Sequence, residues 1–192
     1  NVCMAEQKNR SKSDAVQEKG DWIVLKDDAE VVFAGYETLE TDSQIVRYRE
    51  IKEKKKTIFQ IVLEKTPFYA ESGGQVADKG KIILDDFTLE VINVQKEGKD
   101  IIHYCQGPEE VNIIHSKVIA KVDQNFRYPT MYNHTSTHLL HEALRRVLGE
   151  HVEQAGSLVS PEKLRFDFKH FKRLEKQELT EIENIVNAQI GR

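Results

Sequence analysis

Apolar and polar residues alternate in short runs through the first two thirds of the chain, and this pattern predicts β-strands. The runs are rich in β-branched and aromatic residues, and clusters of Gly, Asp and Lys separate them, which is typical of consecutive antiparallel strands. The expected strands are residues 31–34, 45–51, 57–63, 80–84, 87–95, 101–104 and 117–122. Seven short strands joined by turns predict a small antiparallel β-barrel.

Beyond Pro129 the spacing of the apolar residues changes to about 3.6, the period of an α-helix. This spacing predicts a helix over residues 131–148, which Gly149 would end as a C-terminal cap. The apolar stripe of the helix consists of Leu139, Leu140, Ala143, Leu144, Val147 and Leu148.

A hairpin and a second helix are predicted to complete the chain. Residues 152–159 and 163–168 read as two strands, separated by Ser160 and Pro161. The last helix begins near Lys176 and is amphipathic. Its inward residues are expected to be Leu179, Ile182, Ile185, Val186 and Ile190.

These elements predict an α+β chain with three parts. Residues 1–20 are expected to form a connector segment, because residues 4–19 are mostly Lys, Glu, Gln, Ser and Ala with few apolar positions. Residues 21–126 form the predicted barrel domain, and the lysine-rich run 52–56 is interpreted as a solvated hairpin tip. Residues 127–192 form the first part of a two-layer α/β domain, cut short inside its last helix.

Composition narrows the class of protein. A chain of 192 residues with 39% hydrophobic and 31% charged residues is an ordinary globular protein of one domain or two small ones. Its formal net charge of -4 disfavours a basic nucleic-acid clamp, although an enzyme that meets nucleic acid through a local patch remains compatible with it.

Cysteine usage and hydropathy indicate a cytoplasmic protein. Cys3 and Cys105 lie far apart and form no Cys-x-x-Cys pair, so neither a disulfide framework nor a cysteine zinc site is expected. No apolar run approaches the ~20 residues of a membrane helix, and the start of the chain has no signal-peptide core. Because the chain does not begin with Met and its pattern stops inside a helix, we expect an internal piece of a longer protein.

Two histidines are the first candidates for chemistry. His134 and His138 are four residues apart on one predicted helix, so both imidazoles face the same side and can reach one zinc ion. Two ligands are half a site, and Thr135 stands where the metalloprotease motif His-Glu-x-x-His needs Glu. By spacing alone, such histidines are more often ordinary surface or core residues, and His141 is interpreted as a packing or hydrogen-bonding residue.

A glycine pair followed by glutamine is the second candidate. Gly73 and Gly74 allow a tight turn and a close approach of the backbone to a ligand, and Gln75 offers an amide donor and acceptor. A plain turn between strands explains the same three residues, and without other support it is the better interpretation.

Polar residues of the predicted hairpin form the third candidate. Gln154, Ser157 and Asp167 could face the same cavity as the two histidines, although the phase of the strand is open. Arg165 and Asp167 share one face of the second strand. Its other face carries Phe166 and Phe168, which are expected to be core residues.

Taken together, these strings resemble alanyl-tRNA synthetases and the free-standing editing proteins related to them. The resemblance covers nearly the whole chain and is most specific over residues 66–75, 133–140, 154–159 and 165–168. It implies that the whole protein attaches alanine to tRNA(Ala) with ATP and Mg²⁺, in an upstream aminoacylation domain that this sequence lacks. It also implies that the present region belongs to an editing site that hydrolyses Ser-tRNA(Ala) and Gly-tRNA(Ala).

The resemblance assigns roles to individual residues. His134 and His138 match two zinc ligands, which in the family are completed by a Cys-x-x-x-His further along; this sequence ends before that pair, so weak zinc binding and little activity are expected of it. The implied catalytic residues are Gln154 and Thr137, with Thr135 as an alternative to Thr137. The implied substrate or tRNA contacts are Gly73, Gly74, Gln75, Arg165 and Asp167.

Two other interpretations stay open from the sequence. A free-standing editing hydrolase would carry the same motifs, although the connector at residues 4–19 favours a multidomain synthetase. A non-catalytic tRNA-binding module with incidental histidines is disfavoured by the net charge of -4.

Overall fold

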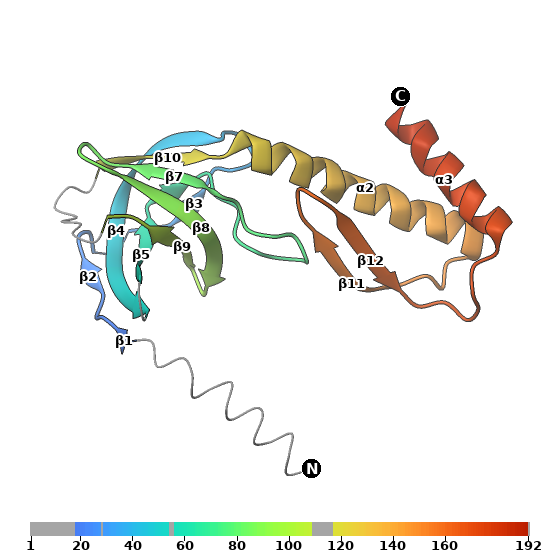
Figure 1. Cartoon of the computed structure of the whole chain (residues 1–192), viewed down its shortest axis with the longest axis horizontal. Coiled ribbons are helices and arrows are strands. Elements are labelled where there is room, and N and C mark those ends of the chain that lie inside the picture. Colours follow the sequence, from blue (N-terminus) through green and yellow to red (C-terminus); the bar gives the residue numbers. More distant parts are fainter. Residues whose placement is uncertain (1–17, 28, 54–55, 109–116, 192) are drawn as a thin grey trace, which may run out of the picture.

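The computed structural model describes residues 18–27, 29–53, 56–108 and 117–191 (Figure 1). The longer strands are β4 (Glu40–Glu53), β5 (Lys56–Leu63), β7 (Gly80–Ile83), β8 (Thr88–Glu97), β9 (Asp100–Gln106) and β10 (Lys117–Val122). Short strands are β1 (Glu18–Lys19), β2 (Ile23–Val24), β3 (Val32–Phe33) and β6 (Lys65–Thr66). The second half contains α2 (Gln124–Leu148), β11 (Gln154–Val159), β12 (Leu164–Phe168) and α3 (Lys176–Ile190).

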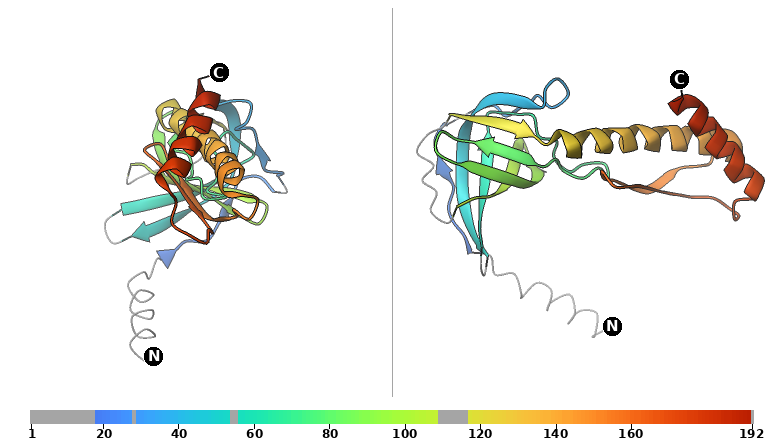
Figure 2. Two further views of the ribbon diagram at one scale, coloured as in Figure 1. Left: turned by 90° about the vertical axis from the view of Figure 1, so that its right-hand side faces the viewer. Right: turned by 45° about the horizontal axis from the view of Figure 1, so that its top comes forward.

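Six antiparallel strands close into a barrel, which confirms the predicted α+β fold. Hydrogen-bonded neighbours follow the order β4-β10-β7-β8-β9-β5, and a pairing between β5 and β4 closes the ring. Closure pairs the edges that an open sheet would expose. Figures 1 and 2 show the barrel at one end of an elongated molecule, with α2 leading away from it.

The barrel forms because alternate residues of its strands are apolar. In β10, every second residue is buried, and β8 begins with the same alternation. The inward side chains meet in one core, in which Phe59, Ile61, Leu63, Ile82 and Leu89 are fully buried. Burying apolar area at about 25 cal/mol per Å² is the main favourable term for such a sheet.

One predicted barrel strand lies outside the barrel. Residues 31–34 were expected to join it, but β3 pairs in parallel with β6 in a separate two-stranded sheet. β6 was not predicted, because two residues are too short for a periodic pattern. Two predictions fall on residues outside the described ranges. The lysine-rich hairpin tip predicted at 52–56 includes residues 54–55, and most of the predicted connector consists of residues 1–17.

The first helix begins seven residues before the predicted start at Met131, and Pro129 lies inside it. Asp123 caps the helix, since its carboxylate accepts a hydrogen bond from the Asn125 N–H at 2.9 Å. A proline in the second turn removes one backbone hydrogen bond. The cap and the buried contacts of Arg127 hold these turns helical, so the proline does not mark the helix start.

The second half has its own small core between α2, the β11–β12 hairpin and α3. Its buried members are Ala143, Leu144, Val152 and Ile182, with Phe166 and Phe168 packed against them. The prediction that Leu179 and Ile190 point inward is wrong, because they are 46% and 61% exposed. Neither described helix is long and apolar enough to span a membrane.

A fully buried histidine lies in the barrel core. The Nδ1–H of His103 donates to the Ile61 carbonyl at 2.9 Å, and its Nε2 accepts from the Thr66 hydroxyl at 2.7 Å. Burial disfavours the charged ring and lowers the pKa of His103 from 6.5 to about 4. The neutral ring is therefore part of the folded barrel.

This histidine makes stability fall in acid. Because the unfolded chain binds a proton at His103 below pH 6.5 and the folded chain does so only near pH 4, stability is lost as the pH falls through that window. We expect the free energy of unfolding to drop by about 2 kcal/mol from pH 7 to pH 5 through this group. Urea unfolding at both pH values measures the drop, and an equally steep drop in a His103→Gln variant would contradict the assignment.

Candidate functional site

A buried ion pair joins the start of α2 to the barrel. The guanidinium Nε of Arg127 donates to both carboxylate oxygens of Asp78, at 2.9 and 3.0 Å, and its Nη2 also contacts Asp78. Two further donors bind the backbone carbonyls of Gly35, at 2.7 Å, and Pro67, at 2.8 Å. Both charged side chains are almost completely buried. Arg127 therefore fixes where α2 leaves the barrel.

The loop that carries Gly73, Gly74 and Gln75 is fastened to β11. The Val159 N–H donates to the Gly74 carbonyl at 2.8 Å, and the Ser157 hydroxyl donates to the Gly73 carbonyl at 3.1 Å. Gly74 has φ +84°, and a Cβ on it would lie 2.3 Å from the Ser157 hydroxyl oxygen. The close approach of the two backbones thus requires glycine at this position.

The two histidines predicted as ligands converge on α2. The Nε2 atoms of His134 and His138 lie 3.1 Å apart. Two nitrogens that each lie 2.0–2.1 Å from a tetrahedral zinc ion would be about 3.3 Å apart, so this spacing fits a shared ion. No group of three or more His, Cys, Asp or Glu side chains that could hold a metal occurs among the described residues.

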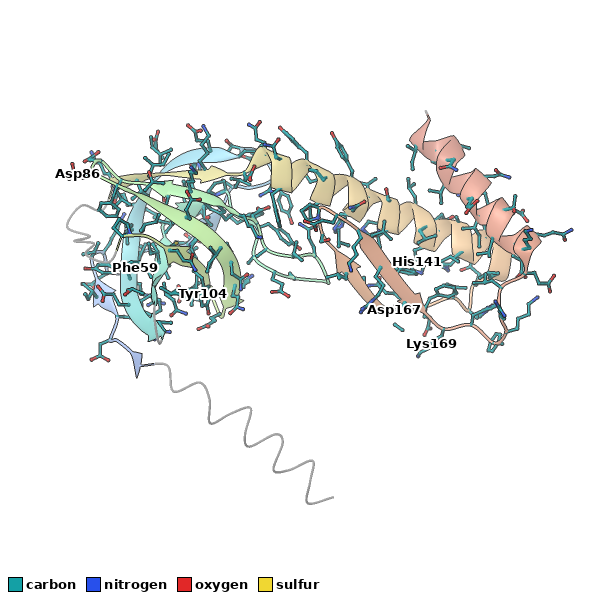
Figure 3. All side chains as sticks on the ribbon, in the orientation of Figure 1. Phe59, Asp86, Tyr104, His141, Asp167 and Lys169 are labelled. Atoms are coloured by element: carbon teal, nitrogen blue, oxygen red, sulfur yellow. The ribbon has the colours of Figure 1, made fainter. Side chains whose placement is uncertain are left out.

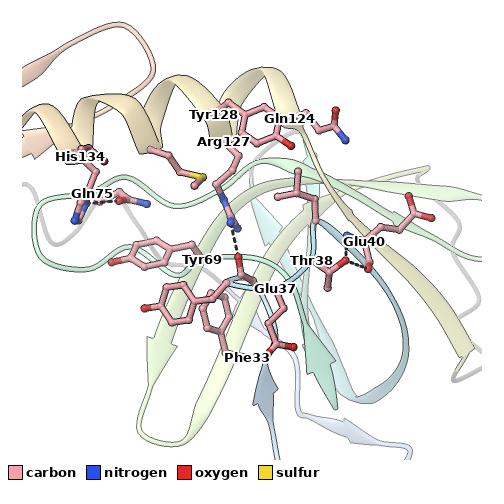
Figure 4. A pocket seen from close by; sticks show the side chains of 15 residues that line it. Phe33, Glu37, Thr38, Glu40, Tyr69, Gln75, Gln124, Arg127, Tyr128 and His134 are labelled. Carbon is pink, nitrogen blue, oxygen red and sulfur yellow. Dashed lines mark hydrogen bonds between the residues drawn. The ribbon is translucent and has the colours of Figure 1, made fainter. Parts of the chain in front are cut away.

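Gln75 reaches the histidine pair from the barrel side. Its side-chain oxygen lies 2.8 Å from Nδ1 of His134, the ring nitrogen opposite the one that faces His138 (Figure 4). The side chain is 7% exposed. The loop and the helix, far apart in the sequence, therefore meet at one hydrogen bond.

A cleft of about 720 Å³ runs along the barrel side of α2 and ends at this hydrogen bond. Figure 4 shows its side chains, which come from residues 33–40, from Tyr69 and Gln75, and from the first turns of α2. Its aromatic lining consists of Phe33, Tyr36, Tyr69 and Tyr128. Phe33 packs edge-on against Tyr36, with ring centres 5.0 Å apart, and Tyr36 is 87% exposed.

The two residues implied as catalytic lie in different surroundings. Gln154 is exposed, and its amide donates to the Ser157 hydroxyl at 3.0 Å, so it joins the contact that holds the Gly73 carbonyl. Thr137 is buried, and its hydroxyl donates to the Asn133 carbonyl of its own helix at 2.8 Å. Thr135, the alternative, lines the cleft.

The remaining candidates occupy the hairpin and the lower part of α2. Arg165 and Asp167 share the exposed face of β12 and form an ion pair at 3.1 Å. His141 lies between α2 and the hairpin (Figure 3), where its Nε2–H donates to the Val152 carbonyl at 3.3 Å. The packing and hydrogen-bonding role predicted for His141 is therefore confirmed.

The described cysteine, Cys105, lies buried in the barrel. Burial strongly raises the pKa of the Cys105 thiol, which keeps it protonated and unreactive.

Sequence reasoning missed Arg127, Asp78 and the aromatic lining of the cleft. A buried arginine looks like any surface arginine in a sequence, because its partners are 49 to 92 residues away. The aromatic residues come from three segments of the chain and form no periodic pattern. For Arg127, the only sequence signal was its place one turn after the capping residue Asp123.

The family model described as tRNA synthetases class II (A) matches residues 1–126. The chain belongs to this family. It is 48% identical over 188 residues to the alanine–tRNA ligase of Bacteroides fragilis, a match that covers 97% of the chain and 21% of that protein. The chain is likewise 47% identical over 191 residues to the alanine–tRNA ligase of Parabacteroides distasonis, a match that covers 99% of the chain and 21% of that protein.

A relative from another organism gives the same result. The alanine–tRNA ligase of Caldicellulosiruptor saccharolyticus is 47% identical over 171 residues, which are 86% of the chain and 19% of that protein. The chain thus spans about a fifth of the length of the curated relatives it matches.

Proposed function

We propose that this region forms part of an editing site that hydrolyses serine or glycine wrongly attached to tRNA(Ala). The observation that carries the proposal is the convergence of His134 and His138, with Nε2 atoms 3.1 Å apart, beside the loop of Gln75. His134 lines one end of an open cleft of about 720 Å³, which we propose receives the end of the tRNA. A site of this kind is useful because an alanine pocket cannot exclude glycine and rejects serine by only about 10²-fold.

The histidines fit a zinc ion as two of its four ligands. Their spacing suits one tetrahedral ion, and the contact of Gln75 with the other ring nitrogen of His134 is the outer contact that metal-binding histidines usually have. When bound, zinc would supply Lewis-acid chemistry at an oxygen of the substrate or of water. Since two ligands do not hold zinc firmly, we expect weak zinc binding and little hydrolysis by the 192-residue chain itself.

The cleft suits the nucleoside end of the substrate. Phe33, Tyr36 and Tyr128 offer aromatic surface on which a base can stack, at about 1–3 kcal/mol per base. Arg127, the cation of the lining, is already paired with Asp78, and Glu37 and Glu40 add negative charge. A base therefore fits this cleft better than a phosphate does.

The hairpin and the glycine loop would hold the aminoacyl group. Gln154 and Ser157 present an amide and a hydroxyl on β11, and Thr135 presents a hydroxyl from α2. Polar groups at these positions can hydrogen-bond a serine hydroxyl, which gives discrimination against alanine. Gly73, Gly74, Arg165 and Asp167 are proposed contacts of the tRNA end, on the exposed side of the same loop and hairpin.

The attachment of alanine to tRNA is a proposal for the whole protein. We propose that it attaches alanine to tRNA(Ala) in the cytoplasm, with ATP and Mg²⁺ bound outside the present residues. The proposal rests on the identity of 46–48% to several alanine–tRNA ligases over nearly the whole chain. The partner that we propose for the whole protein is tRNA(Ala).

A comparison of two chain lengths tests the proposed function. Deacylation of Ser-tRNA(Ala) is measured with the 192-residue chain and with a chain extended through the next Cys-x-x-x-His, and the zinc content of each is determined. We expect hydrolysis and stoichiometric zinc in the longer chain alone, because only that chain would supply four ligands. Inactivity of both chains would remove the editing function, and tight zinc binding by the shorter chain would overturn the split site.

A further inference from the structure

We propose that Gln75 is a positioning residue: its side-chain oxygen holds His134 as the Nδ1-protonated tautomer, so that the Nε2 lone pair faces His138 and is ready to bind a metal ion. The inference rests on the proposed function only for the identity of that metal as zinc. It changes the expected role of Gln75, which the sequence suggested as a substrate contact.

The direction of the hydrogen bond decides the tautomer. An amide oxygen can only accept, so the nitrogen 2.8 Å from it, Nδ1 of His134, must carry the proton. In a neutral ring the other nitrogen, Nε2, then has a free lone pair. The reversed amide would place the proton on Nε2 and block metal binding, so the protonation of the ring tells the two arrangements apart.

The backbone around Gln75 is fixed before any ligand arrives. Gln75 and Ser72 exchange two backbone hydrogen bonds, at 3.0 and 3.2 Å, and the next N–H, of Val76, binds the Val159 carbonyl at 3.0 Å. Together with the glycine contacts to β11, these bonds set the loop against the helix. The side chain is 7% exposed, so water competes weakly for its oxygen.

The two histidines are prepared unequally. His134 has a protein acceptor on Nδ1, whereas the partner found for exposed His138 among the described residues is His134 itself. His138 must therefore adopt its ligand tautomer when the metal binds. Fixing one ring in advance reduces the ordering that binding requires, and the loss of such an outer contact typically weakens metal binding 10–100-fold.

Nitrogen NMR of the histidine rings tests the tautomer directly in the metal-free 192-residue chain. We expect His134 to carry its proton on Nδ1 in the natural chain. The Gln75→Leu variant, of similar size but without an acceptor, should lose this preference, while Gln75→Glu, which keeps an acceptor oxygen, should retain it. A natural chain with His134 protonated on Nε2 would overturn the proposal, whatever the variants do.

Titration with Zn²⁺ alone, followed by the same ring signals, gives the second readout. Gln75→Leu should weaken binding about 10–100-fold and Gln75→Glu should restore it. The matched control is Gln124→Leu, a glutamine at the far end of the same cleft, which should leave the affinity unchanged. Equal affinity in the natural chain and in Gln75→Leu would also overturn the proposal.

These outcomes are independent of the editing reaction. The expected tautomer in the 192-residue chain, together with no hydrolysis of Ser-tRNA(Ala) by the chain extended through the next Cys-x-x-x-His, would support the role of Gln75 and reject the proposed function. Hydrolysis with the opposite tautomer would reject this role of Gln75 and leave the proposed function standing.

Discussion

Replacing Arg127 with Met is expected to lower the free energy of unfolding by about 3–5 kcal/mol, because it leaves a buried carboxylate without its partner. The side chain satisfies Asp78 and the carbonyls of Gly35 and Pro67 at once. Met fills a similar volume but donates no hydrogen bond. Urea unfolding of the natural chain and the variant at pH 7 measures the difference.

Arg146 supplies the matched control for this prediction. It lies on the same helix and pairs with Glu142 at 2.8 Å, but both side chains are more than half exposed. Because exposed pairs contribute little, Arg146→Met should cost less than about 1 kcal/mol. In the double variant Asp78→Asn with Arg127→Met, the loss should be smaller than the sum of the two single losses. Similar losses for Arg127→Met and Arg146→Met would contradict the role of the buried pair.

Replacing His138 with Ala in a chain of the relatives' length is expected to slow hydrolysis of Ser-tRNA(Ala) by more than about 100-fold. An outer contact of a metal costs 10–100-fold, and a direct ligand should cost more. Gln154→Ala should slow the reaction about tenfold, the effect of one neutral hydrogen bond. Both variants should still attach alanine to tRNA, because that reaction is proposed to use another domain. Single-turnover deacylation and alanine charging measure the two activities separately.

Tyr132 provides a control for the helix itself. It lies two residues before His134, is 69% exposed and does not line the cleft, so Tyr132→Ala should leave hydrolysis unchanged. Unchanged hydrolysis in both His138→Ala and Gln154→Ala would remove these residues from the mechanism. Loss of alanine charging together with hydrolysis would instead point to a general defect in folding.

The sequence alone was sufficient to predict the elements that have a strong local pattern of apolar and polar residues. β10, from Lys117 to Val122, was predicted to the residue because its side chains alternate strictly between core and solvent. The His134 and His138 pair was predicted to share a helix face, since four residues make about one turn. Local periodicity is written into neighbouring residues and needs no knowledge of the fold.

Only the tertiary structure decided features that depend on distant partners. The helix start at Gln124 depends on a cap and on the buried Arg127, so Pro129 misled the sequence prediction. β3 left the barrel because its partner, β6, is a two-residue strand about thirty residues away in sequence. Gln75 meets His134 across 59 residues, and no local pattern encodes that contact. The sequence alone showed which side chains have groups that can bind a metal or a substrate. The packing of the barrel and its loops against α2 decided which of these side chains lie together, because their contacts join residues that are far apart in the sequence.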